Sequence, residues 1–264
     1  MNYSTIKLDL AAGVARLALN RPAQMNALNG DMYDEMRHAV AWAGRSDEVR
    51  VVVITGEGNA FCSGGDLAYQ QSQATRPHDE RLAEASKLAL MLQEINVLPK
   101  PVIARVNGLA YGGGLGLVAA SDIVVAHDEV RFALPEVTLG LMPSMISPFV
   151  VAKMGTSYAR SVFLSGRPFG AQEAARFGLV HEHVPVGELD AAVQRHVDFI
   201  LRCAPGAVAQ TKQLISFVHT HDVGENFKHT VELVAQMWSS PEAQEGMSSF
   251  LAKRKPSWRA PLSN

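Results

Sequence analysis

Two glycine-rich turns carry the residue pattern best suited to chemistry. One reads Ser63-Gly64-Gly65, the other reads Gly112-Gly113-Gly114, and each comes after an apolar run that predicts a buried strand. The second turn opens a segment typical of a helix, and the first amides of a helix lack intrahelical partners and lie at the positive end of its dipole. If the two strands are neighbours, one amide from each turn, that of Gly113 in the second, can converge on one oxygen as an oxyanion hole.

Two other interpretations of these glycines remain open. Glycine also permits tight turns and close packing, which is sufficient for either turn taken alone. The pattern Gly114-x-Gly116-x-x-Ala119 formally matches a dinucleotide-binding motif. We give this second interpretation little weight, because residues 107–111 separate the predicted strand from the glycines by more than the usual tight turn.

Glu136 is the best candidate for an acid or base beside such a hole. It follows Pro135 in the apolar stretch 132–137, and burial there would raise its pKa towards the range useful for proton transfer. The alternative is an ordinary surface glutamate at a helix end. Asp66 and Asp122 are interpreted as structural caps. We expect no metal site, because the histidine pairs 181/183 and 219/221 lack a third ligand at useful spacing.

The elements that would position these groups alternate between strands and helices. Uninterrupted apolar strands are typical of a parallel sheet that helices cover on both faces. We predict a hairpin at 6–19, a helix at 28–43, a strand at 51–55, a turn at 60–66, a mobile loop at 70–80, a helix at 88–95, and strands at 102–106 and 123–126.

The last third of the sequence is almost entirely helical in pattern. Apolar stripes at helical spacing predict helices at 171–177, 189–201, 208–218 and 227–238, and Ser240-Pro241 marks the start of another. We therefore expect an α/β body over residues 1–185 and a helical region over residues 186–264.

Composition indicates a globular protein without a nucleic-acid or membrane partner. The 264 residues are 47% hydrophobic and 19% charged, with a formal net charge of -2. No apolar run approaches the ~20 residues needed to span a bilayer, and the N-terminus has no signal-peptide pattern. Because Cys62 and Cys203 are the only cysteines, we expect a cytoplasmic protein without a disulfide framework.

A series of short motifs runs through the chain in a fixed order and spacing. They are Asn20-Arg21-Pro22 with 26–28, 53–56 with 61–67, 100–104 with 112–114, Phe132 with Pro135-Glu136-Val137, 140–143, 245–247, Phe250 and 253–256. By these motifs the sequence resembles, from Ile6 to Trp258, the crotonase, or enoyl-CoA hydratase/isomerase, superfamily. The resemblance implies a spiral of ββα units with a C-terminal helical region for trimerisation.

The same resemblance assigns roles to individual residues. The amides of Gly65 and Gly113 would hold the thioester oxygen of an acyl-CoA as it becomes an enolate, with Glu136 as the acid or base. Coenzyme A is then part of the substrate, and no separate cofactor is expected. Family members commonly form trimers or dimers of trimers. The adenine and pantetheine groove would form around Ala23, Gln24, Met25, Ser63 and Leu67, with Phe250 and Lys253 near the nucleotide, reaching across from another subunit.

One departure from the family pattern bears on the reaction. Many hydratases of the family use two glutamates, and the position of the first is here Gly116, so only Glu136 is present. A single base suits an isomerase that carries a proton between C2 and C4. Residues 114–120 and 139–150, however, look closest to a bacterial branch of hydratases that also lacks the first glutamate. That branch acts on 3-substituted glutaconyl-CoA esters in leucine and terpene breakdown.

The prediction is therefore a hydratase (hydro-lyase) adding water to a branched glutaconyl-CoA, such as 3-methylglutaconyl-CoA or isohexenylglutaconyl-CoA. Two alternatives are an enoyl-CoA isomerase using the same site, and a noncatalytic relative that binds acyl-CoA or RNA. Arg76 or Arg131 is expected to meet a distal carboxylate. The acyl pocket is assigned to Gly116, Ser144, Met145 and Ile146, together with the loop 70–80.

Overall fold

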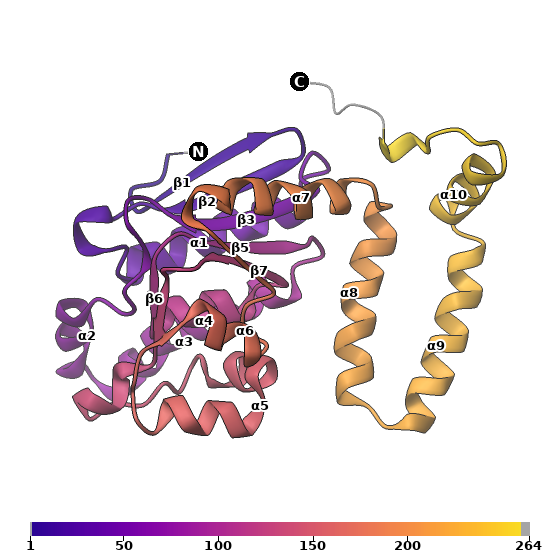
Figure 1. The fold of residues 1–264 in the computed structure, drawn as a ribbon. Coiled ribbons are helices and arrows are strands. Elements are labelled where there is room, and N and C mark those ends of the chain that lie inside the picture. The colour runs from indigo at the N-terminus through magenta and orange to yellow at the C-terminus, as the bar shows by residue number, and fades with distance from the viewer. Residues whose placement is uncertain (1, 260–264) are drawn as a thin grey trace.

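A six-stranded sheet forms the centre of the body in the computed structural model, which describes residues 2–259 (Figure 1). β1 and β2 form the predicted antiparallel hairpin, and every other pair in this sheet is parallel, as expected. The strand order is β1 (Ile6–Ala11), β2 (Val14–Leu19), β3 (Val51–Gly56), β5 (Val102–Val106), β7 (Ile123–His127) and β10 (Glu182–Val184).

A second, four-stranded sheet is built from strands of two or three residues. Its order is β4 (Ala60–Cys62), β6 (Leu109–Tyr111), β8 (Arg131–Ala133) and β9 (Phe169–Gly170), with the first three parallel and β9 antiparallel to β8. The prediction of a turn over 60–66 is wrong for its first three residues, because they pair with β6. Each central strand is followed by a short one, so β3–β4, β5–β6 and β7–β8 repeat the same unit.

Helices cover both faces of the central sheet, and successive strand residues point to opposite faces. Val52 and Ile54 of β3 face the larger core, and Val51 and Val53 face a smaller one that α7 (Leu189–Leu201) completes. None of the helices within residues 2–259 is both long and apolar enough to cross a membrane. The larger core receives side chains from α1 (Gly30–Arg45), α3 (His78–Val97), α4 (Gly113–Ala120), α5 (Ser147–Phe163) and α6 (Ala171–Arg176).

The mobile loop predicted at 70–80 is instead largely helical. Residues Leu67–Ala74 form α2, and α3 begins at His78 after a break at Pro77. The side chain of Asp66 accepts a hydrogen bond from the amide of Tyr69, so the predicted cap at Asp66 is confirmed. The loop prediction failed because α2 is polar and buries no residue, which leaves no apolar stripe to read.

Three helices leave the body at the C-terminal end: α8 (Pro205–Thr220), α9 (Val223–Trp238) and α10 (Pro241–Leu251). Figure 1 shows them projecting away from the sheet, with α9 beside α8. The helix α7 lies beyond the predicted boundary at residue 185 but packs on the sheet, so the projecting part begins at α8. Lys212 ties α8 to the body, because its ammonium group donates to Asp122 Oδ2 at 2.7 Å. Asp122 thus holds two segments together instead of capping a helix.

Candidate active site

Three neighbouring parallel strands end at one edge of the small sheet, and each leads into a candidate functional segment. β4 leads into the turn with Gly65, β6 leads into the turn with Gly113, and β8 leads into the segment with Glu136. The carboxyl ends of parallel strands meet at the same edge of a sheet. Strand order therefore brings together residues that are far apart in the sequence.

The two glycine turns touch each other. A β-carbon added at Gly64 would lie 3.2 Å from the carbonyl oxygen of Tyr111, and one added at Gly112 would lie 3.7 Å from the α-carbon of Gly64. Gly112 also has φ 46° and ψ -118°, a conformation that residues with a side chain rarely adopt. Glycine is thus required here both for the backbone conformation and for the close approach.

The amides of Gly65 and Gly113 are unpaired donors at this junction. Their neighbours are engaged: the amide of Gly64 donates to Cys62 Sγ at 3.4 Å, and that of Gly112 donates to the carbonyl of Ala133 at 2.9 Å. Neither Gly65 N–H nor Gly113 N–H donates to any group within residues 2–259. Buried main-chain donors normally find partners, so two free ones lining the same cavity are suited to bind an anionic oxygen.

Glu136 lies against the second glycine turn. A β-carbon added at Gly112 would lie 2.9 Å from Glu136 Oε1, and Glu136 Oε2 is buried without a hydrogen-bond partner among the described residues. Burial raises the pKa of this carboxyl above its ordinary value, against a smaller opposing effect of its own backbone amide. A raised pKa suits a group that must both take up and release a proton near neutral pH.

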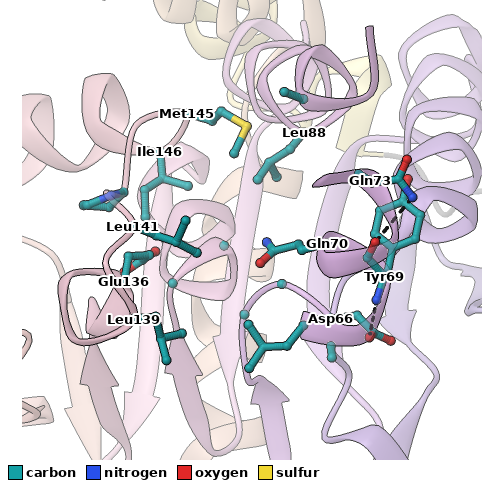
Figure 2. Close-up of a pocket in the computed structure, with 18 of the residues that line it drawn as sticks. Asp66, Tyr69, Gln70, Gln73, Leu88, Glu136, Leu139, Leu141, Met145 and Ile146 are labelled. Atoms are coloured by element: carbon teal, nitrogen blue, oxygen red, sulfur yellow. Dashed lines mark hydrogen bonds between the residues drawn. The ribbon is translucent and has the colours of Figure 1, made fainter. Parts of the chain in front are cut away.

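These groups line a cavity of about 860 Å³. Figure 2 shows Glu136 on one side of the cavity and Gln70 on the other. The lining contributed by α3 and by the segment after Glu136 is mainly apolar, which suits an acyl chain. Its larger apolar side chains are Leu88, Leu139, Leu141, Met142, Met145 and Ile146.

The other carboxylates of the cavity are engaged. Asp66 accepts from the guanidinium of Arg21 at 2.9 Å in addition to capping α2. Glu84 accepts a hydrogen bond from the hydroxyl of Tyr69 and lies 3.4 Å from the ammonium of Lys87. Among the acidic side chains that line the cavity, Glu136 therefore differs in having a buried oxygen with no partner in the described part of the chain.

Comparison with known proteins decides the family. Residues 9–261 match the family described as enoyl-CoA hydratase/isomerase. The chain belongs to the enoyl-CoA hydratase/isomerase family. It is 33% identical over 247 residues to the Xenopus laevis enoyl-CoA hydratase domain-containing protein 3, mitochondrial, covering 93% of this chain and 83% of that protein. It is 30% identical over 261 residues to a Clostridium acetobutylicum short-chain-enoyl-CoA hydratase, covering 97% of each.

A solved structure confirms the fold. The crystal structure of an enoyl-CoA hydratase from Shewanella pealeana superposes with a TM-score of 0.93 at 34% identity, covering 97% of this chain and 96% of that one. The predicted membership of the crotonase superfamily, the α/β spiral with its helical C-terminal region and the enzymatic nature of the chain are thus confirmed. The bacterial glutaconyl-CoA branch remains a prediction.

Within this enoyl-CoA hydratase/isomerase family member, the predicted coenzyme A residues fall into two groups. Around the cavity mouth, the amide of Ser63 donates to the carbonyl of Met25 at 2.9 Å, and Met25 and Leu67 are 52% and 57% exposed. Gln24 also lines the cavity, and Ala23 lies beside it in a short 3-10 helix without lining the cavity. Phe250 and Lys253 form the second group, at the end of α10, and are not part of the lining.

The predicted acyl-pocket residues also divide. Ser144, Met145 and Ile146 line the cavity, whereas Gly116 is buried in α4 and does not. A β-carbon added at Gly116 would lie 2.5 Å from Ile146 Cγ2. In this enzyme, then, the space beside the position of the family's first glutamate holds the side chain of Ile146.

The segment 70–80, also assigned to the acyl pocket, contributes only Gln70 and Gln73 to the cavity lining. Arg81 was not considered in the sequence prediction, yet it lines the cavity, unlike Arg76 and Arg131. The usable signal was Asp66, because a capping residue before a run of good helix formers predicts a helix there. That helix carries Gln70 into the cavity.

Proposed function

We propose that this protein is a hydratase that adds water across the 2,3 double bond of a 3-substituted glutaconyl-CoA. Suitable substrates include 3-methylglutaconyl-CoA and isohexenylglutaconyl-CoA. The observation that supports this best is the pair of amides, Gly65 and Gly113, which line the same cavity as Glu136; neither these amides nor the buried Oε2 of Glu136 has a partner within residues 2–259. The two amides can stabilise the negative charge of an enolate, and the carboxyl can transfer the proton.

In this proposal the amides of Gly65 and Gly113 hold the thioester oxygen as it gains negative charge. Each such donor typically contributes ~3 kcal/mol to transition-state stabilisation. Glu136 takes a proton from water as the oxygen of water bonds to C3, and it then delivers a proton to C2. Coenzyme A belongs to the substrate, and the reaction needs no separate cofactor.

The cavity suits a branched acyl chain that ends in a carboxylate. Its wall is mainly apolar, and Arg81 from α3 lines it as well. A guanidinium binds a carboxylate with directed hydrogen bonds. Arg81 is accordingly assigned to the distal carboxylate, in place of Arg76 or Arg131. The Arg81→Gln variant should then raise KM for 3-methylglutaconyl-CoA and leave KM for crotonyl-CoA, which has no distal carboxylate, unchanged.

We also propose a homotrimer or a dimer of trimers as the assembly. Apolar side chains remain exposed along α8, α9 and α10, and a surface of this kind is typical of an interface. Light scattering should give a mass of three or six chains, and Phe227→Glu with Trp238→Glu should lower it. The exposed residues are Ile215, Val218, Val223, Phe227, Val231, Val234, Trp238, Met247, Phe250 and Leu251.

The direct test of the reaction is loss of the conjugated enoyl-thioester absorbance when enzyme is mixed with 3-methylglutaconyl-CoA. The wild-type enzyme should consume it, and Glu136→Gln should lower kcat by a factor of ~10² to 10⁴. Glu129→Gln, an exposed residue outside the cavity, serves as the matched control. Equal rates for wild type and Glu136→Gln would disprove the proposal.

A second candidate function is isomerisation of the double bond. It is favoured by Glu136 being the one acidic side chain of the cavity, among residues 2–259, with a buried unpaired oxygen, because moving a proton between C2 and C4 requires only one base. The two reactions differ in the fate of solvent oxygen. Mass spectrometry in H₂¹⁸O should show one solvent oxygen in the product of a hydratase and none in the product of an isomerase.

A further inference from the structure

Adding water to a double bond requires the water molecule to be oriented, and Glu136 alone cannot orient it. This inference rests on the proposed hydratase function. Water must be held with a lone pair towards C3 while one of its hydrogens points at the base. A single carboxyl fixes one of the two hydrogens and leaves the molecule free to rotate about that bond. Misplacing a reactant by ~1 Å can reduce the rate by ~10²-fold. A second polar group near the glycine turns is therefore expected.

Gln70 is placed to be that group. It lies in the first turns of α2, four residues beyond the Asp66 cap. A β-carbon added at Gly65 would overlap Gln70 Nε2, so the carboxamide lies directly over this glycine turn. Figure 2 shows its polar end directed into the cavity towards the side that carries Glu136.

The two side chains flank the glycine junction from opposite directions. Gln70 packs on Gly65, whereas Glu136 Oε1 lies 2.9 Å from the β-carbon position of Gly112. That same position is 3.7 Å from the α-carbon of Gly64. A thioester whose oxygen is held between the two turns would therefore lie beside the space that the carboxamide and the carboxyl both face.

The carboxamide of Gln70 is also available for a ligand. Neither its nitrogen nor its oxygen hydrogen-bonds to another group within residues 2–259. The carboxylates of Asp66 and Glu84, by contrast, are already bound. A carboxamide offers an acceptor and two donors and carries no charge, so it can orient water without changing the protonation of Glu136.

We propose that Gln70 holds the water that adds to C3. Its carboxamide oxygen accepts one hydrogen of the water, and Glu136 accepts the other. The oxygen of water bonds to C3, and the electron pair of the double bond moves into the enolate held by Gly65 and Gly113. Glu136 takes the proton from water and returns a proton to C2. One water is added in total, and Gln70 gains and loses no proton.

The test separates hydration from proton transfer at C2. Hydration of crotonyl-CoA and 3-methylglutaconyl-CoA needs the held water. Exchange of the C2 hydrogens of butyryl-CoA in D₂O needs Glu136 and the two amides but no addition of water. Gln70→Leu should lower kcat for hydration by about 100-fold with KM nearly unchanged, and it should keep the exchange rate within about threefold of wild type, since the base is untouched.

Two further variants complete the experiment. Gln71→Leu makes the same change at an exposed neighbour on α2 that does not line the cavity, and it should hydrate like wild type. Gln70→Glu retains an acceptor and should recover part of the hydration rate. Because the added carboxyl titrates, this recovery should depend on pH, whereas the wild-type contribution of Gln70 should not.

The outcomes distinguish this inference from the function on which it rests. If wild type hydrates the esters and Gln70→Leu does so equally well, the water-binding role is wrong and the hydratase function stands. If Gln70→Leu loses hydration and exchange in the same proportion, Gln70 supports the site as a whole and the role is again wrong. If wild type exchanges C2 hydrogens but hydrates neither ester, both proposals fail.

Discussion

Ile146 and Gly116 share a space that accommodates only one side chain. The methyl group Cγ2 of Ile146 lies 2.5 Å from the point where a residue at position 116 would place its β-carbon. Ile146 is buried and β-branched, so its side chain has little freedom to move away. Ile146 therefore fills the space that a carboxylate side chain at position 116 would need.

The first prediction concerns this packing. Gly116→Ala should lower the free energy of unfolding by ~1 to 3 kcal/mol, because overpacking displaces a rigid neighbour. The better helix propensity of alanine alone would raise stability by ~1 kcal/mol. A loss of stability would therefore be due to the clash with Ile146. Urea denaturation measures it. Gly187→Ala, where an added β-carbon meets nothing within 4 Å, is the control, and adding Ile146→Ala should make the loss at Gly116 smaller.

The second prediction follows from the raised pKa of Glu136. Folded protein holds this proton more tightly than the unfolded chain, so the free energy of unfolding should fall as pH rises from the ordinary value of 4.5 through the raised one. Glu136→Gln removes this penalty and should gain ~0.5 to 2 kcal/mol at neutral pH. The gain should vanish in acid. A variant that is less stable than wild type at pH 7.5 would contradict this.

The third prediction concerns the pH dependence of activity. Taking a proton from water requires the ionised form of Glu136, whose pKa is raised by burial. Hydration should therefore decline on the acid side at a pH above the ordinary 4.5 of a glutamate. This decline of activity towards acid pH should be seen in kcat/KM measured across pH, and it should be absent from the residual activity of Glu136→Gln. If the same decline persists in the variant, another titrating group causes it.

The fourth prediction compares two glycines with positive φ. Gly112 has φ 46° and Gly155 has φ 70°, so an alanine at either position is strained and should cost ~1 to 3 kcal/mol. Only at Gly112 does the new β-carbon also meet Glu136, at 2.9 Å from Oε1, whereas at Gly155 it meets nothing within 4 Å. Gly112→Ala should therefore lose most activity, and Gly155→Ala should keep it when both are assayed well below their melting temperatures.

The fifth prediction concerns the connection between α8 and the body. The side chain of Lys212 is 14% exposed and pairs with Asp122. Lys212→Met should cost about 3 kcal/mol, because it leaves a partly buried carboxylate without its cation, with the amide of Val102 still donating to it. Asp122→Asn together with Lys212→Met should cost less than the sum of the two single changes in urea denaturation. Additive losses would show that the pair is not coupled.

Long elements were predictable from hydrophobic periodicity, whereas the short strands that place the site were not. The strand β3 is a nearly continuous β-branched run and β5 is rich in valine and isoleucine, and both were predicted within about one residue. β4 and β6 have three residues each, too few to show a period, and pairing in the second sheet defines them. The glycine turns were thus expected after β3 and β5 with no strand between, but they follow β4 and β6.

The parts of the candidate site that could be predicted are those with a recognisable residue type, namely the glycine turns and the carboxyl group. Glycine at positions 65 and 113 and a carboxyl at 136 have recognisable types and spacing, and the structure brings their segments together. Gln70 and Arg81 were not predictable in this way, because their role depends on which side of α2 and α3 faces the cavity. Neither helix has a strong apolar stripe near these residues that would have indicated its orientation.

The pairing of Lys212 with Asp122 spans 90 positions in the chain. The ribosome releases the strands and both glycine turns long before it releases Lys212, and domains generally fold as units during synthesis. Until α8 emerges, the carboxylate of Asp122 can accept from the amide of Val102 but lacks the ammonium group of Lys212. The strands and glycine turns of the nascent chain can thus pair while its last helices are still being made.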